Sequence, residues 1–369
     1  VLMGNIELDY KIHGFEDLHL HVNGGMDVAS GKSNKNYNRF DLDNYYYGRV
    51  GWNTQDTYNL SLNMYAQYMK DFGKAHHFDI MAGYEWQHFH KETDYYYYGT
   101  YPDTNLEHAG EIYNPSENTL YKTENYLVSF FGRMNYSLLD RYLLTFTLRD
   151  DGSSRFSKKN RWGLFPSLSV GWNISEESFF DRFRWLVNSL KLRFSYGTTG
   201  NQNFPDYSYA PAIYKNYDYT FGTGTSEILA NGFTQLGFAN PNVKWETTQQ
   251  LNAGIDMALY NNKLILGLDL YKSNKKNMLF PMVVPPSNGG GQSSTVTLNA
   301  GDMENRGVEF SLTHRNKIRG VNYSLTGTFN KNVNEIVSMA GKNELYFFPD
   351  GKPVSSGSDY VTAIKKGYE

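Results

Sequence analysis

Apolar and polar residues alternate along this chain in segment after segment. The even positions from Tyr58 to Tyr68 are apolar or aromatic, whereas most of the odd positions between them are polar, and the pattern returns at 78–87, 167–174 and 321–330. Because successive side chains of a β-strand point to opposite faces, this alternation predicts strands with one apolar and one polar face. We predict about twelve long strands, at residues 5–13, 16–25, 57–70, 76–90, 124–136, 141–150, 162–174, 190–198, 247–259, 263–272, 305–315 and 319–331.

The connections between the predicted strands alternate in length. Short turns lie around Gly14, at 71–75, at 137–140, at 261–262 and around Asn316. The long connections are residues 26–56, 91–123, 151–161, 199–246, 273–304 and 332–369. The connection 175–189 is of middle length, and we predict a short amphipathic helix there on the short-turn side.

Long strands with short turns on one side and long loops on the other are typical of an outer-membrane β-barrel. Lipid offers the backbone no hydrogen bonds, so a spanning sheet must close, with apolar side chains facing lipid and polar ones lining a lumen. Aromatic residues near the strand ends fit the interfacial girdles of such barrels: Tyr10, Tyr58, Tyr136, Trp172 and Tyr260. A soluble β-sandwich also alternates, but it does not explain why every second connection is long.

Composition narrows the class of protein further. The 369 residues carry 35 Lys plus Arg against 38 Asp plus Glu, a net charge of −3, which argues against a nucleic-acid binder that neutralises phosphates. The absence of Cys excludes a disulfide framework, a thiolate metal site and a cysteine nucleophile. No apolar run approaches the roughly 18 residues that a membrane-spanning helix needs. The first residues show no signal peptide, so we expect an internal piece of a longer protein whose targeting signal lies upstream.

Several segments resemble the SusC/RagA-like family of TonB-dependent outer-membrane transporters. The most specific is LTFTLRDDGSSRFSKKNRWGLFPSLSVGWNISEESFF at 144–180, followed by LKLRFSYGTTGNQ at 190–202. NPNVKWETTQQLNAGIDMALYNNKLILGLDLYKSNKKNML at 240–279, GDMENRGVEFSL at 301–312, FNKNVNEI at 329–336 and FGKAHHFDIMAGYEWQ at 72–87 also fit. The segments keep the order of the family along most of residues 57–340.

The resemblance implies a fold and a function. It implies that the chain supplies about 12 strands of a 22-stranded transmembrane antiparallel β-barrel in the outer membrane of a Gram-negative cell, with long extracellular loops and short periplasmic turns. We find no match to the plug domain, the TonB box or the C-terminal closing strands of the family, and we expect residues 1–369 to be a partial barrel domain. The implied function is import of oligosaccharides, or of peptides, without catalysis or a cofactor.

The resemblance also implies partners. A SusD-like surface lipoprotein is expected to contact residues 91–123, 199–246 and 273–304. The TonB-ExbB-ExbD energy complex is expected to act through the missing N-terminal part. Two rivals stay open at this point: a soluble all-β glycan-binding module or glycoside hydrolase, and a passive porin.

Aromatic density in the long connections marks the residues that we expect to touch substrate. Tyrosine combines a ring for stacking with a hydroxyl for hydrogen bonds, at little conformational cost. The candidates are Tyr96, Tyr97, Tyr98, Tyr101, Tyr207, Tyr209 and Tyr214. The alternative is that these rings pack the loops against one another or lie in the outer girdle.

Charged residues fall at predicted inward positions of the strands. They are Asp79, Glu85, Arg133, Arg149, Lys191, Arg193, Asp256, Asp269 and Glu309. Arg149 and Arg193 are candidates for substrate binding, whereas the simpler role for the whole set is to contact water and the plug.

Two sequence motifs contain metal-ligating residue types but lack the full set of ligands that a metal site needs. His76, His77, His88 and His90 form a cluster in which His88 and His90 share a strand face, but a third ligand is not evident, so we predict no metal site. Residues 149–156 resemble a calcium loop only in Asp150, Asp151, Gly152 and Ser153, and a hydrogen-bonded turn is the simpler interpretation. No nucleophile elbow or framed carboxylate pair stands out, so we predict that the protein is not an enzyme.

Overall fold

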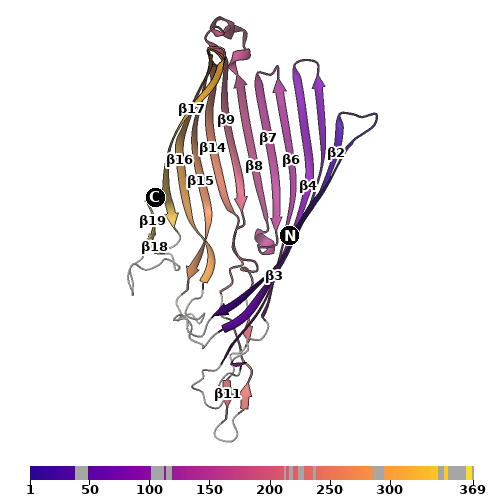
Figure 1. Cartoon of the computed structure of the whole chain (residues 1–369), viewed down its shortest axis with the longest axis vertical. Helices are drawn as coiled ribbons and strands as arrows, with labels where there is room; N and C mark the ends of the chain where they lie inside the picture. Colours follow the sequence, from indigo (N-terminus) through magenta and orange to yellow (C-terminus); the bar gives the residue numbers. More distant parts are fainter. Residues whose placement is uncertain are drawn as a thin grey trace.

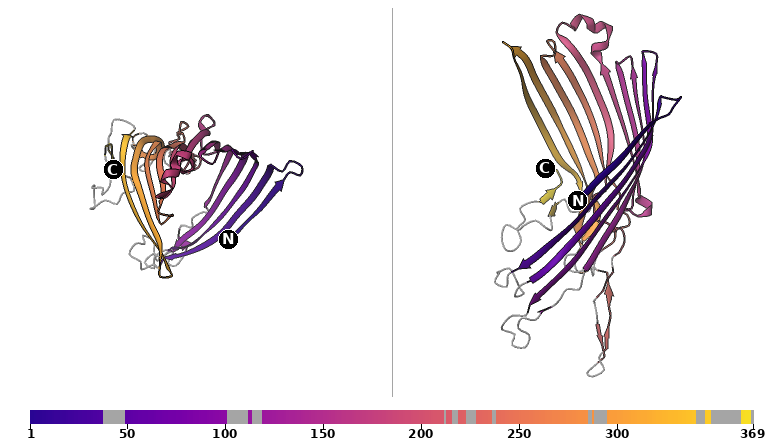
Figure 2. Two further views of the ribbon diagram at one scale, coloured as in Figure 1. Left: turned by 90° about the horizontal axis from the view of Figure 1, so that it is seen from above. Right: turned by 45° about the vertical axis from the view of Figure 1, so that its right-hand side comes forward.

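The computed structural model describes residues 1–37, 49–100, 112–113, 119–211, 213–215, 219–222, 228–235, 238–284, 287, 295–339, 345–347 and 363–367. Its main feature is one 13-stranded antiparallel sheet with the order β1-β2-β3-β4-β6-β7-β8-β9-β14-β15-β16-β17, to which β5 (Ile112–Tyr113) adds beside β4. Figure 1 shows these long strands side by side, and Figure 2 shows from above that the sheet curves strongly.

The long strands follow one another as an antiparallel meander. They are β1 (Leu2–Lys11), β2 (Leu18–Tyr37), β3 (Arg49–Phe72), β4 (His76–Thr100), β6 (Thr119–Leu138), β7 (Tyr142–Ser153), β8 (Trp162–Asn173), β9 (Val187–Asn201), β14 (Glu246–Leu259), β15 (Leu264–Val283), β16 (Thr295–Ile318) and β17 (Val321–Met339). All twelve predicted strands are therefore confirmed. Three two-stranded sheets pair β10 (Tyr214–Lys215) with β13 (Phe233–Thr234), β11 (Tyr219–Phe221) with β12 (Ile228–Ala230), and β18 (Leu345–Phe347) with β19 (Ala363–Lys365).

The register separates the two faces of the sheet cleanly. One row across the strands is apolar: Ile80, Met134, Phe146, Leu168, Tyr196 and Leu251. The row displaced by one residue in each strand is polar: Asp79, Asn135, Thr145, Ser169, Ser195 and Asn252. The nine predicted inward charges all fall on this polar face. A slip of one residue would exchange the faces, so the alternation fixes the register.

The apolar face has no second layer over it among the residues that the structure describes. Ile80 and Leu168 are each 42% exposed, although both lie in the middle of the sheet. A sandwich would bury such rows between two sheets. The soluble β-sandwich alternative is therefore wrong, and the exposed band has the character of a lipid-facing surface.

The strands are longer on one side than the sequence predicts. The predicted connections 26–56, 91–123 and 273–304 are largely strand, because β2, β3, β4, β6, β15 and β16 run far into them. A 24-residue strand is about 80 Å long at ~3.3 Å per residue, whereas the apolar band of a barrel is about 25 Å tall. Beyond the lipid both faces meet water, so alternation is lost there and gives no signal of strand.

The short-turn side closes with tight turns and one longer connection. Gly73 and Gly320 take positive φ angles in these turns. The middle-length connection contains two 3₁₀ helices, η2 (Ile174–Glu176) and η3 (Ser178–Phe183), so short helical structure lies where we predicted a short amphipathic helix. Glu177, between the two, accepts hydrogen bonds from Tyr142 at 2.6 Å and Trp172 at 3.1 Å, which hold its carboxyl pKa below its usual value and pin the segment to the sheet. No helix within the described residues is long and apolar enough to cross a membrane.

Candidate functional site

A small hydrophobic core lies at the long-loop ends of β7, β8, β9 and β14, over the polar face of the sheet. It consists of Phe156, Phe165, Phe204, Val243 and Trp245, and we name it the loop core. Phe156 is completely buried, and its ring centroid lies 4.8 Å from that of Trp245. Because its members come from 154–161, from β8 and from 202–245, the loop core joins segments that are distant in sequence.

Polar contacts hold the same segments together around the loop core. The Arg155 guanidinium donates to Asp206 over 2.7 Å, and the Trp245 indole donates to the Arg161 carbonyl over 3.0 Å. In β9, Gly200 leaves room for the core, because a Cβ at this position would meet the Phe165 ring at 2.1 Å. The extracellular-type loops therefore begin from a rigid base.

Glu246, at the start of β14, ties the loop core to β9 and β15. Its carboxylate accepts from Lys275 and Asn201, each over 2.8 Å, and from the Leu279 amide over 3.0 Å. Burial by itself raises the pKa of this carboxyl, but the three donors outweigh it, so the pKa lies below its usual value. The carboxylate is thus ionised and fully engaged at neutral pH.

Arg149 lies on the polar face of β7 and is held by residues of β7 itself and of the strands β6 and β4. It donates to Asp151 at 2.7 Å, Glu85 at 2.6 Å and Ser129 at 2.8 Å. Asp150 lies on the opposite face, in register with Phe130. Because Asp150 and Asp151 point to opposite faces, they cannot share a cation. Residues 149–153 belong to β7, and the predicted hydrogen-bonded turn is limited to residues 153–156, where the Phe156 amide donates to the Ser153 carbonyl over 3.3 Å.

Arg193, the second predicted lumen arginine, is held in the same way. It makes a bidentate pair with Asp256, at 2.6 and 3.0 Å, and also donates to Asp269 at 3.2 Å. These carboxylates come from the two strands that follow β9 in the sheet. Both arginines therefore stiffen the lumen wall, and about a third of each side chain stays exposed toward the polar side.

The predicted loop tyrosines that the structure describes fall on three segments: β4, the turn at 206–209 and β10. Tyr96, Tyr97 and Tyr98 continue β4, and Tyr214 begins β10. Tyr207 takes a positive φ of 62°, and its hydroxyl accepts a hydrogen bond from the Glu124 amide at 3.1 Å. Tyr209 is half-buried in the same turn, whereas Tyr101 lies outside the described residues. Their role in binding stays a prediction.

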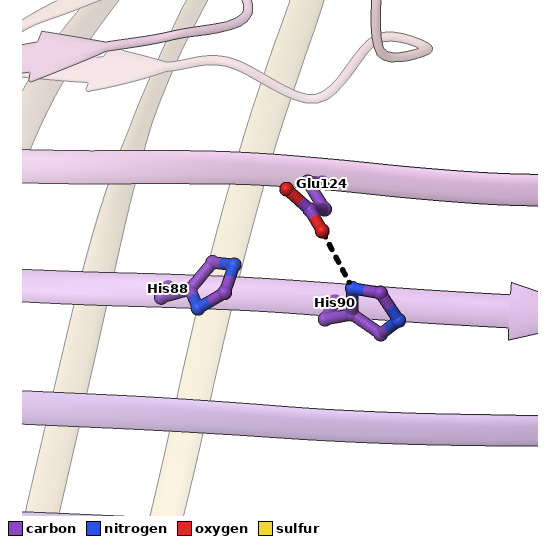
Figure 3. Close-up of side chains that lie close together, drawn as sticks. All are labelled: His88, His90 and Glu124. Atoms are coloured by element: carbon purple, nitrogen blue, oxygen red, sulfur yellow. Dashed lines mark hydrogen bonds and ion pairs between the residues drawn. The ribbon is translucent and has the colours of Figure 1, made fainter.

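The four clustered histidines divide between the two ends of the sheet. His76 and His77 lie at the short-turn end, where they contact Tyr136 and Asp71. His88 and His90 lie toward the long-loop end of β4, and the pairing of β4 with β6 brings Glu124 beside them, as Figure 3 shows. Sequence reasoning missed Glu124 as a third ligand, because only the register of two strands could have supplied it.

Fold and surface together define the class of protein: a segment of a transmembrane β-barrel with a lipid-facing apolar band and a polar lumen wall. Residues 4–359 match the model of the family described as "TonB dependent receptor-like, beta-barrel". The chain belongs to this family, and with it to the proteins of the outer membrane.

Individual relatives place the chain more closely. It is 40% identical over 374 residues to the TonB-dependent receptor SusC of Bacteroides thetaiotaomicron, a match that covers 99% of this chain and 36% of SusC. It is 34% identical over 305 residues to the TonB-dependent receptor P3 of Formosa agariphila, covering 81% of this chain and 29% of that protein. The predicted SusC/RagA-like membership is confirmed, and these relatives are receptors rather than enzymes.

Among solved structures, the RagAB peptide transporter is similar, with a TM-score of 0.80 and 24% identity over 99% of this chain and 39% of that one. This likeness shows the fold alone. The chain thus spans between 29% and 39% of the length of these three relatives.

Proposed function

We propose that this chain forms the middle to late part of the barrel of an outer-membrane, TonB-dependent nutrient importer of the SusC kind. The observation that supports this most is the 40% identity to SusC along 99% of the chain, combined with a sheet whose apolar rows face outward uncovered. In the full protein, a plug domain would obstruct the lumen that the polar face lines, and the TonB-ExbB-ExbD complex would act on that plug.

The loops and the polar wall would then both contribute to import: the loops would hold the ligand, and the wall would line its path. The loop core gives the long connections a rigid base from which they can hold a ligand above the lumen. Lumen charges are paired across strands, so the wall presents polar groups without a strong field of one sign. The energy for import would come from the proton gradient through TonB. No covalent bond of the ligand is made or broken.

A SusD-like surface lipoprotein is the partner that we propose for the long-loop side. The described parts of 91–123, 199–246 and 273–304 lie on this side, and we propose that these connections contact it. In the described part of 199–246, the hairpin of β11 and β12 extends far from the sheet (Figure 1) and exposes Tyr219, Phe221 and Ile228. Exposed apolar side chains such as these favour contact with another protein.

The ligand class that we propose first is an oligosaccharide, which the tyrosines of the long connections would stack against. A peptide is the second candidate, since RagAB, which shares the fold, is described as a peptide transporter. For either ligand, Tyr96, Tyr97, Tyr98, Tyr101, Tyr207, Tyr209 and Tyr214 are the proposed contacts, with Arg149 and Arg193 below them in the lumen wall.

Uptake by a strain that lacks this protein tests the proposal. We expect the deletion to abolish uptake of labelled oligosaccharides of one class, and TonB removal to do the same. Replacing Tyr96, Tyr97 and Tyr98 together by Ala should lower uptake at least tenfold, whereas Tyr10→Ala, at the short-turn end, should leave it unchanged. Uptake that persists without TonB would establish the passive porin instead, and loss of peptide uptake alone would select the second ligand class.

A further inference from the structure

Two histidines and a glutamate converge on the outer face of the sheet, away from the lumen. His88 and His90 are two residues apart on β4, so they share a face, and Glu124 of β6 lies directly opposite His90. One ring nitrogen of each histidine and one carboxylate oxygen lie within 4.8 Å of one another. Figure 3 shows the three side chains together on the two neighbouring strands.

This group lies at the upper edge of the lipid-facing band. On the same face, Tyr126 lies directly opposite His88. Trp86 precedes His88 by two residues on β4 and lies closer to the membrane centre. Beyond them the outward positions turn polar, with His90, Glu92 and Lys122. The group therefore faces the level of the lipid headgroups, where a cation can arrive from water.

Stacked tyrosines fix both imidazole rings. His88 lies parallel to Tyr126, with ring centroids 4.3 Å apart and planes at 1°, and His90 stacks on Tyr58 at 4.1 Å and 13°. The His90 residue is only 4% exposed. Rings held in this way lose little further freedom on binding a metal, so the site is preorganised.

The hydrogen bonding around the three side chains is incomplete. The His90 Nδ1–H donates to Glu124 over 3.0 Å, but the Nε2 of His88 is buried and has no hydrogen-bond partner. Glu92 lies 3.6 Å from the other nitrogen of His90, and Lys122 lies 3.3 Å from the Glu124 carboxylate. Around the two histidines, the carboxyl side chains of Glu92 and Glu124 therefore outnumber the single ammonium of Lys122.

We propose that His88, His90 and Glu124 bind a divalent transition-metal ion such as Zn²⁺. Imidazole nitrogens with one carboxylate are a donor set for zinc, and three protein ligands leave a fourth position for water or a headgroup oxygen. The metal takes the place of the proton shared by His90 and Glu124 and gives the orphaned nitrogen of His88 a partner. Ligand atoms of tetrahedral zinc lie about 3.4 Å apart for bonds of ~2.1 Å, so small rotations of the side chains complete the site.

A metal ion at this site would link the lipid-facing side of β6 to the connection 202–245. The Glu124 amide donates to the Tyr207 hydroxyl, and Tyr207 belongs to the connection 202–245. A metal that fixes Glu124 therefore also restrains the end of this connection against β6. The inference does not depend on the proposed transport function, because it concerns binding of the metal alone.

Zinc binding by the full protein in detergent, after removal of metal with a chelator, tests the proposal. We expect competition with a chromophoric chelator to show a Zn²⁺ site that is weakened at least tenfold by His88→Gln and by Glu124→Gln. Lys122→Gln should tighten it severalfold, because it removes a competing cation. The control His77→Gln, at the opposite end of β4, should leave it unchanged.

Cu²⁺ provides an independent readout of the ligands. Its electron paramagnetic resonance spectrum should show coupling to two imidazole nitrogens, reduced to one in His88→Gln. Since the Nε2 of His88 has no hydrogen-bond partner to lose, this variant should fold even if a variant of the buried His90 does not. Equal zinc affinity in the parent protein, His88→Gln and Glu124→Gln would overturn the proposal.

Discussion

The loop core and the lipid-facing band use the same kinds of side chain in opposite ways. Phe156 and Val243 of the loop core are at most 1% exposed, whereas Leu168 and Phe146 of the band are 42% and 40% exposed. In the loop core, aromatic rings from three segments bury one another. In the band, each side chain stands beside its cross-strand neighbours and leaves its outer surface for lipid.

This contrast shows that the loops of this chain are suited to water, whereas the outer face of its sheet is suited to lipid hydrocarbon. Where water surrounds the loops, apolar residues are stabilised only by contact with each other. Where hydrocarbon surrounds the sheet, burial against protein brings no such advantage, and closure of the backbone hydrogen bonds becomes the dominant demand. Substitutions should therefore have different effects in the two regions.

Removing a ring from the loop core should have the largest effect. Trp245→Ala leaves a cavity and also frees the Arg161 carbonyl, so we expect a loss of about 3–5 kcal/mol in the free energy of unfolding. The measurement is urea-induced unfolding in detergent, with limited proteolysis of the long-loop side. Trp162→Ala is the matched control, because Trp162 lies on the outer face and is 48% exposed. An equal loss of unfolding free energy in both variants would contradict the proposed difference between the loop core and the lipid-facing band.

A charge placed on the lipid-facing band should have the next largest effect. Leu168 lies on β8 midway between Trp162 and Trp172 on the same face, so Leu168→Arg should cost about 2–4 kcal/mol. Ser169→Arg, one residue later on the polar face, should cost little. The amount of protein assembled in the outer membrane, read from heat-modifiable migration on gels, checks the pair. Equal assembly of both variants would contradict a lipid-facing Leu168.

Filling the space beside Phe165 should have a moderate effect. In Gly200→Ala the new methyl group meets a buried ring that has nowhere to move, so we expect a loss of about 1–3 kcal/mol. Gly24→Ala is the control, because a Cβ there meets nothing within 4 Å. Thermal unfolding monitored by tryptophan fluorescence distinguishes the two, and a stable Gly200→Ala would mean that the loop core is loosely packed.

Acid should loosen the loop core before it affects the band. The pKa of Glu246 is lower in the folded than in the unfolded protein, so its contribution to stability is present above pH about 4.5 and is lost as pH falls further. We expect protease sensitivity of residues 202–245 to rise below that pH. In Glu246→Gln this part of the pH dependence should vanish, and its survival would assign it to another group.

The sequence predicted the twelve long strands because lipid on one side and water on the other impose alternation. It could not predict how far β4 continues past His90, since both faces of that extension meet water. The sequence also predicted a short helix in the connection 175–189, but not its 3₁₀ form, because a short amphipathic pattern does not distinguish one helix type from another.

The sites were less predictable than the fold. The face of Arg149 and Arg193 followed from alternation, but their carboxylate partners come from other strands and depend on register. The position of Glu124 beside His90 likewise depends on the register between two strands. The motif residues around Phe156 and Trp245 carried the family resemblance, yet only tertiary packing shows that they form one core.

Spin labels attached at two adjacent positions of β8 test most directly whether its two faces meet different solvents. These 369 residues contain no Cys, so Leu168→Cys and Ser169→Cys each add a single labelling site to this part of the protein. In lipid bilayers, the label at 168 should collide more with oxygen, which dissolves in hydrocarbon, and the label at 169 more with a water-soluble nickel chelate. The reverse order, or equal accessibility at both positions, would contradict the account.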